Sequence, residues 1–238
     1  MSATDLNERI KIFLNSAVKK ISGKDYDSAI EKLSAALVLD KENPEILYNL
    51  GICYCRLELY HTAATYLTKV RDLPLTFIDV LAVIKMLSYS LIMADDIPQA
   101  KKNINDGLKI SKTDTTLLNM LGFILEKENK PDEALAVYKM IIEIDKDNSN
   151  AYNSAAYIMS ANNGNLNDAL LYARNALRHN PDNPAYLDTM GCLQMKKGQL
   201  DTAKRFLKKA LEKLPDSREI KDHINQLLKI PPSNEKLK

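Results

Sequence analysis

The chain has 238 residues, 45% of them hydrophobic, which is enough to bury a sizeable core in one domain or two. Its 33 Lys and Arg against 31 Asp and Glu leave a net charge of +2, so no strong overall field favours nucleic acid or an anionic membrane. Cys53 and Cys55 lie too close on one element to pair, and the third cysteine is left over, which argues against a disulfide framework. With no export signal among the first twenty residues, we expect a reducing, cytoplasmic location.

Alanines recur along the chain at nearly constant spacing. Intervals of 34, 37, 34, 35 and 34 residues separate Ala29, Ala63, Ala100, Ala134, Ala169 and Ala203. Gly51, Gly122 and Gly191 each precede one of these alanines by 12 residues. Two helices joined by a tight turn approach closely only where the facing residues lack bulk, so we expect each glycine to face its alanine across a helix pair.

Three segments share the register of these glycines: LYNLGICY (47–54), LLNMLGFIL (117–125) and YLDTMGCL (186–193). With the alanines that follow, they make the sequence resemble the tetratricopeptide repeat family, whose 34-residue unit is a helix, a short turn and an antiparallel helix. The resemblance implies an all-α fold, a right-handed α-solenoid of about six helix-turn-helix units with a C-terminal capping helix. It also implies a binding function rather than catalysis.

The spacing of these glycines and alanines divides nearly the whole chain into repeats. In chain order we expect an N-terminal extension (1–9), six repeats (10–43, 44–80, 81–114, 115–148, 149–183 and 184–217), a capping helix (218–230) and a disordered tail (231–238). Pro98 and Pro131 open second helices, where a missing N–H costs nothing. The capping helix is expected to bury the apolar residues Ile220, Ile224, Leu227 and Leu228.

Residues 75–93 are almost continuously apolar. Asp79, Lys85 and the repeat register argue against a membrane-spanning helix, because charges at the centre of a span are costly. Two interpretations stay open: a helix buried between its neighbours, or an extra apolar face for a partner or a second copy of the chain.

Candidate groups for chemistry are few. Cys53 and Cys55 point about 200° apart on one helix and cannot hold a metal together, so Cys53 is expected to be a core residue. His61, His179 and His223 have no second ligand at metal-binding spacing and are expected on the surface. No nucleotide, hydrolase or kinase signature is present. We therefore predict no catalytic residues, no metal and no cofactor.

The resemblance implies that the first helix of each repeat lines an inner groove that receives an extended peptide or a partner helix. Residues three and four apart share a helix face, which identifies the groove lining in this sequence. The predicted lining has an aromatic and methionine-rich centre bordered by amides, and it consists of Tyr48, Asn49, Ile52, Lys85, Met86, Tyr89, Asn119, Met120, Phe123, Asn153, Tyr157, Asp188 and Cys192. Tyr89, Phe123 and Tyr157 either contact a partner or pack against neighbouring repeats, and both interpretations remain.

Two functions of different kinds follow. The first is a non-enzymatic adaptor or scaffold that binds a peptide or helix of another protein in the groove. The second is a structural platform that associates with itself, or docks, through the apolar helix 75–93 or the chain ends. The partner in the first case is a protein, with no role for nucleic acid or for a membrane span; the second allows a homo-oligomer.

Overall fold

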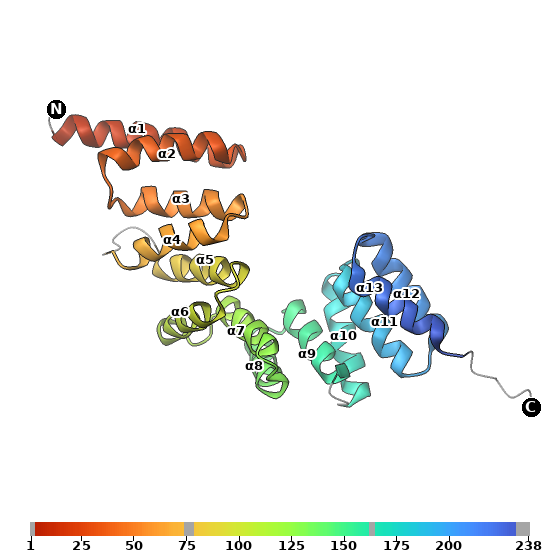
Figure 1. The fold of residues 1–238 in the computed structure, drawn as a ribbon. Helices are drawn as coiled ribbons and strands as arrows, with labels where there is room; N and C mark the ends of the chain where they lie inside the picture. The colour runs from red at the N-terminus through yellow and green to blue at the C-terminus, as the bar shows by residue number, and fades with distance from the viewer. Residues whose placement is uncertain (1–2, 74–78, 162–164, 232–238) are drawn as a thin grey trace, which may run out of the picture. The chain divides into compact units, whose positions relative to one another are not determined.

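A computed structural model describes residues 3–73, 79–161 and 165–231, and every regular element within these ranges is an α-helix (Figure 1). The all-α prediction is therefore confirmed. The helices are α1 (Ala3–Ser22), α2 (Tyr26–Leu39), α3 (Pro44–Arg56), α4 (Tyr60–Arg71), α5 (Val80–Met93), α6 (Ile97–Ile110), α7 (Thr115–Lys127), α8 (Pro131–Ile144), α9 (Ser149–Ala161), α10 (Leu166–His179), α11 (Pro184–Lys196), α12 (Leu200–Lys213) and α13 (Arg218–Lys229).

These helices belong to two compact units, Met1–Met120 (unit 1) and Leu121–Lys238 (unit 2), and the boundary falls within α7. In unit 1, α1 packs on α2, α3 on α4 and α5 on α6. In unit 2, α9 packs on α10 and α11 on α12, and α13 covers α11 and α12. We call the odd-numbered helices α1 to α11 first helices and their even-numbered partners second helices.

Helix α1 begins earlier than the sequence analysis expected. Residues 1–9 were predicted to be an extension, but the helix already starts at Ala3. The reason is that the apolar stripe of Ile10 and Leu14 continues back to Leu6, which packs against the same cluster.

An Asn or Asp side chain marks the start of most first helices. Asn43, Asp79, Asp114, Asn148 and Asn183 each stand immediately before a first helix and accept a hydrogen bond from a backbone N–H in its first turn. Such caps satisfy donors that the helix leaves unpaired. Because they recur at repeat spacing, they fix where each first helix begins.

Within each helix pair whose turn the structure describes, that turn contains one residue in the left-handed region. At Lys24, Glu58, Asp95 and Asn129 the φ angle is 58 to 61°, and at Gly198 it is 78°. This conformation ends a helix and lets the chain reverse. Only Gly198 takes it without steric cost, because it has no Cβ. Residues 162–164, between α9 and α10, lie outside the described residues.

The close contact between paired helices is not the one predicted. A Cβ on Gly51 would lie 2.7 Å from the Cγ of Leu67, and one on Gly122 would lie 2.6 Å from the ring of Tyr138. Each glycine thus faces the residue 16 positions further on, one helical turn beyond the alanine that was expected. Ala63 is buried all the same. The antiparallel helix crosses one turn further along than the sequence spacing suggested.

The apolar segment 75–93 forms a largely buried helix where the structure describes it. Leu75 to Ile78 lie outside the described residues, and α5 begins at Val80 after its cap Asp79. Seven of the 14 residues of α5 are buried, and the helix contacts α3, α4 and α6. This supports the interpretation of a helix buried between neighbours. Among the described residues, no helix has both the length and the apolarity needed to cross a membrane.

Helix α13 caps unit 2 with one difference from the prediction. Ile220 and Leu227 are buried and Ile224 is half-buried, but Leu228 is 68% exposed. Leu228 is rotated about 100° from Leu227 around the helix, so both cannot face α11 and α12. Apart from Pro231, the predicted tail lies outside the described residues.

Candidate functional site

The predicted groove residues of unit 1 lie on three first helices and leave one aromatic side chain open. Tyr48, Asn49 and Ile52 come from α3, Lys85, Met86 and Tyr89 from α5, and Asn119 and Met120 from α7. All are half-buried except Tyr89, which is 41% exposed. Burial raises the pKa of Tyr48, with a smaller contribution from the charge of Asp79. We call this set the inner face of unit 1.

Tyr89 both packs and remains accessible. Its ring meets the ring of Tyr60 edge to face, with the centroids 6.0 Å apart. This geometry is favourable for aromatic pairs and fixes the ring in place. The sequence analysis left packing and partner contact as alternatives, and the structure shows packing against Tyr60 on one side with an exposed side remaining.

The amides of this face are partly used within their own helices. The Nδ2 of Asn49 donates to the carbonyl of Glu45 at 2.8 Å, and the Nδ2 of Asn119 donates to the carbonyl of Thr115 at 2.7 Å. Each bond spans four residues along one helix. What these side chains can still offer to a partner is therefore the amide oxygen, which is an acceptor, and the second N–H of the amide.

Lys85 does not stand free on the inner face. Its Nζ donates to the carboxylate of Asp114 at 2.9 Å, and the other oxygen of Asp114 caps α7. Burial alone would raise the pKa of Asp114, but the hydrogen bonds from Lys85 and from the backbone N–H of Leu117 hold it below its usual value. Lys85 thus links one first helix to the start of the next.

The predicted groove residues of unit 2 begin with two further exposed aromatic rings. Phe123 on α7 is 43% exposed, with the ammonium of Lys127 5.6 Å from its ring centroid, and Tyr157 on α9 is 44% exposed. Asn153 on α9 is half-buried, and no donor among the described residues reaches its buried Oδ1. Phe123, Asn153 and Tyr157 form the inner face of unit 2.

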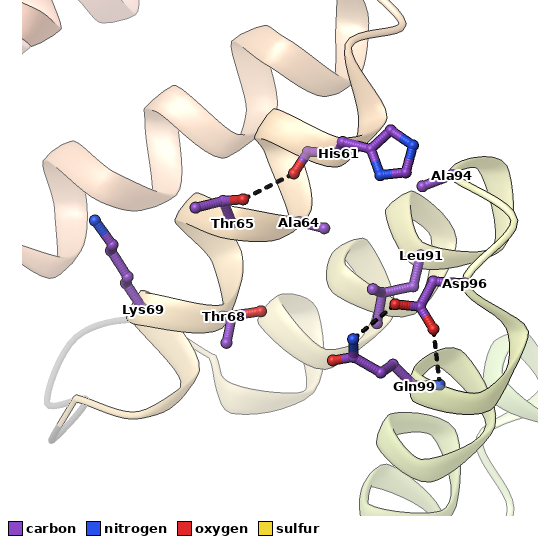
Figure 2. A pocket seen from close by; sticks show the side chains of 9 residues that line it. All are labelled: His61, Ala64, Thr65, Thr68, Lys69, Leu91, Ala94, Asp96 and Gln99. Atoms are coloured by element: carbon purple, nitrogen blue, oxygen red, sulfur yellow. Dashed lines mark hydrogen bonds between the residues drawn. The ribbon is translucent and has the colours of Figure 1, made fainter.

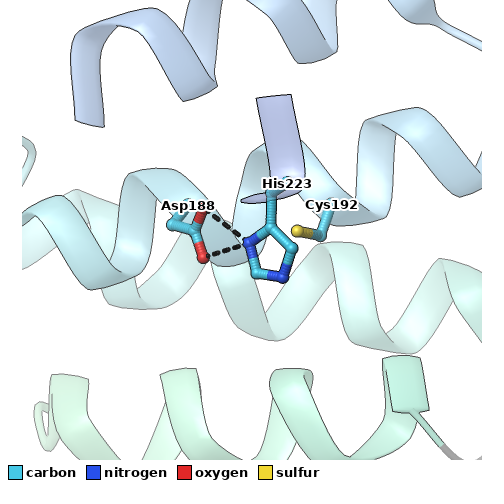
Figure 3. Close-up of side chains that lie close together, drawn as sticks. All are labelled: Asp188, Cys192 and His223. Carbon is cyan, nitrogen blue, oxygen red and sulfur yellow. Dashed lines mark hydrogen bonds and ion pairs between the residues drawn. The ribbon is translucent and has the colours of Figure 1, made fainter. Parts of the chain in front are cut away.

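Asp188 and Cys192, also predicted to line the groove, are covered by the capping helix instead. Figure 3 shows the imidazole of His223, from α13, lying between the carboxylate of Asp188 and the thiol of Cys192. The Nδ1 of His223 is 2.9 Å from both carboxylate oxygens of Asp188, and Asp188 is only 7% exposed. The hydrogen bond with Asp188, followed by that with Cys192, raises the pKa of His223 to about 10. His223 is therefore a protonated partner of Asp188 at neutral pH.

The expectation that all three histidines lie on the surface was wrong for His223. Its side chain is 18% exposed, whereas His61 is exposed as expected. Sequence reasoning missed it because nothing in the spacing connects α13 with α11. One signal was available: His223 lies between Ile220 and Leu227 on the same helical stripe, the stripe that a capping helix buries.

A shallow hollow of about 460 Å³ lies on another side of unit 1, among α4, α5 and α6 (Figure 2). Its polar groups are already engaged in local helix structure. Thr65 donates to the carbonyl of His61 at 3.0 Å, and Gln99 donates to Asp96, the cap of α6, at 2.6 Å. The hollow is lined by His61, Ala64, Thr65, Thr68, Lys69, Leu91, Ala94, Asp96 and Gln99.

Comparison with known proteins identifies the repeat. Models described as TPR repeat or tetratricopeptide repeat match residues 20–57, 115–148 and 161–227, together more than half of the chain. The chain belongs to the tetratricopeptide repeat family. It is 31% identical over 132 residues to TPR repeat-containing protein PA4667 of Pseudomonas aeruginosa. That match covers 56% of this chain but only 22% of the Pseudomonas protein.

Solved tetratricopeptide repeat proteins share the fold. A tetratricopeptide repeat protein from Parabacteroides merdae superposes with a TM-score of 0.77 at 14% identity, covering 92% of this chain and 86% of that chain. YrrB, described as a TPR protein with an unusual peptide-binding site, gives a TM-score of 0.56 at 19% identity, covering 81% of this chain and 97% of that chain. At these identities the likeness establishes the tetratricopeptide repeat fold alone.

Proposed function

We propose that this protein is a non-enzymatic adaptor that binds an extended peptide or a helix of a partner protein on the inner faces of its first helices. The observation that carries the proposal is the recurrence of an exposed aromatic ring at one register position. Tyr89 on α5, Phe123 on α7 and Tyr157 on α9 occupy that position, each more than 40% exposed. Rings exposed in this way can serve as anchors for a partner.

The chemistry beside these rings suits a peptide. Aromatic side chains are enriched among the residues that contribute most to binding at protein interfaces. On the inner face of unit 1, which also carries Tyr89, the oxygens of Asn49 and Asn119 can accept from backbone N–H groups whatever the sequence of the peptide. Half-buried Met86 and Met120 add adaptable apolar contact. The similarity in fold to YrrB, with its peptide-binding site, is compatible with this use of the face.

The free thiols support a cytoplasmic location for the proposed adaptor. Cys53, Cys55 and Cys192 are all free, and Cys192 is only half-buried. Free accessible thiols persist in a reducing environment, so we place the adaptor in the cytoplasm.

The test is a comparison of variants with matched surface changes. Full-length wild-type protein is used to capture partners, which are identified by mass spectrometry, and the captured partner is then purified for titration. We expect Tyr89→Ala with Phe123→Ala to weaken its binding at least tenfold. As a control, Ile110→Ala with Leu171→Ala removes two exposed apolar side chains from second helices and should leave the affinity unchanged. Equal binding by both double variants, with unchanged helical circular dichroism, would contradict the proposal.

A further inference from the structure

Three chemically different metal-binding side chains meet where α13 covers α11. One carboxylate oxygen of Asp188, the Sγ of Cys192 and a ring nitrogen of His223 all lie within 4.8 Å of one another (Figure 3). It is the one such group that the described part of the chain contains. We propose that Asp188, Cys192 and His223 form a binding site for a divalent transition-metal ion, with Zn²⁺ the best match.

The two helices present these ligands in a fixed arrangement. Asp188 and Cys192 are four residues apart on α11, so their side chains project from the same face one turn apart. His223 reaches this face from α13, which is anchored by buried Ile220 and Leu227 three residues before it and four residues after it. Because both helices are held by packing, the ligands are preorganised rather than gathered from flexible loops.

The distances suit a zinc ion. Bonds of about 2.0–2.3 Å in tetrahedral geometry place ligand atoms roughly 3.3–3.8 Å from one another. The Nδ1 of His223 now lies 2.9 Å from the oxygens of Asp188, and all three ligand atoms fall within 4.8 Å. To hold an ion, the side chains would rotate so that the first distance opens and the others close.

The set of donors selects the metal. Thiolate and imidazole favour zinc and other late divalent transition metals, whereas calcium and magnesium prefer sites made of oxygen atoms alone. Three protein ligands leave the fourth tetrahedral position for water, as in zinc sites that are not purely structural.

The metal-free protein holds the same side chains as an ion pair with a neighbouring thiol. Zn²⁺ would replace the proton between His223 and Asp188 and the proton of the Cys192 thiol, and both protons would go to solvent. The bound ion then ties α13 to α11 more strongly than the ion pair does. Because an unfolded chain lacks this arrangement of ligands, binding raises the unfolding midpoint of unit 2.

Cobalt spectroscopy on the full chain tests the site. Chelator-treated, reduced protein is titrated with Co²⁺, and one equivalent is expected to produce a thiolate-to-cobalt charge-transfer band together with intense d–d bands of tetrahedral cobalt. Zn²⁺ should bleach these bands and raise the unfolding midpoint, whereas Mg²⁺ should do neither. Weak absorption without the charge-transfer band, or binding of several equivalents without saturation, would overturn the proposal.

Matched variants separate this site from adventitious binding. Cys192→Ser preserves the size and the hydrogen bonding of a half-buried side chain, and it should abolish the charge-transfer band and weaken Zn²⁺ binding by about tenfold or more. His223→Gln should do the same. Cys55→Ser changes the other half-buried cysteine, on α3, and should leave the spectrum intact. A band that survives Cys192→Ser but disappears in Cys55→Ser would place the metal elsewhere and refute the assignment, and circular dichroism of each variant shows whether it is folded.

Discussion

Lys85 in unit 1 and Asp188 in unit 2 occupy the same register position, three residues before the small-residue contact of their first helices, yet they meet different surroundings. Lys85 pairs with Asp114, the residue that caps the next first helix, and the two side chains are 31% and 13% exposed. Asp188 pairs with His223 of the capping helix, and the two side chains are 9% and 18% exposed. Both pairs are 2.9 Å long, so the difference lies in burial rather than in distance.

The difference shows how position in the array determines what an inner-face residue can do. Where another repeat follows, the first helix keeps an exposed side, and Tyr89 remains available one turn beyond Lys85. Where the array ends, a capping helix must cover the last hairpin, and it also covers the polar residues there. The same register position therefore pairs with the cap of the next first helix in one unit and with the capping helix in the other.

The largest effect expected from this comparison is on stability. Removing one member of a buried pair leaves the other without compensation, and the cost is smaller where one partner is partly open to water. We expect Asp188→Ala to lower the free energy of unfolding by about 2–3 kcal/mol and Lys85→Ala by about 1 kcal/mol. Urea denaturation followed by far-ultraviolet circular dichroism measures both, since the chain has no tryptophan to report by fluorescence.

Chelator is kept in these solutions so that a bound metal does not add to the cost of losing Asp188. Asp188→Asn provides a variant of the same shape and should fall between the wild type and Asp188→Ala. Equal losses for Asp188→Ala and Lys85→Ala would mean that burial at α13 does not distinguish the two positions.

Much of the fold could be predicted because the sequence pattern of one helix pair occurs several times along the chain. Small residues recur at fixed spacing, as Ala63 and Gly51 do, and so does the proline that opens α8. Each recurrence supports the interpretation of the others. The contact between α11 and α13 could not be predicted in the same way. It occurs once, so Asp188 and His223 have no repeated spacing to reveal them. The partner of each glycine was missed by one turn because spacing alone does not fix where two helices cross.

The second prediction compares the helix contact in the two units. Ala at either glycine gains about 1 kcal/mol of helix propensity but places a methyl group inside a filled contact. At Gly51 the methyl group meets Leu67, whose branched side chain can shift by a rotation. At Gly122 it meets the rigid ring of Tyr138, which is also held by a 2.6 Å hydrogen bond to Glu126. We expect a net loss of about 1 kcal/mol for Gly51→Ala and about 2–3 kcal/mol for Gly122→Ala.

Denaturation curves of the two single variants measure this difference, and the combination of Gly51→Ala with Leu67→Ala checks its cause. If the clash with Leu67 is responsible, the double variant should lose less stability than the two single losses together. A Gly122→Ala protein as stable as the wild type would show that the Tyr138 ring moves freely.

The smallest expected effect concerns Glu126, which accepts the hydrogen bond from Tyr138. Burial raises the pKa of Glu126, and the hydrogen bond from Tyr138 opposes this only in part. A carboxyl group whose pKa is higher in the folded protein contributes stability at low pH and loses it as the pH rises through the folded pKa. Glu126→Gln removes this titration while keeping an oxygen that can accept from Tyr138. We therefore expect the variant to match the wild type near pH 4 and to be more stable by about 0.5–1 kcal/mol at pH 8.

Exposed Glu143 on α8 supplies the control, since Glu143→Gln makes the same change in net charge without burial. Its stability should follow the wild type across this range, and a Glu126→Gln profile parallel to that of Glu143→Gln would mean that the buried carboxylate carries no penalty.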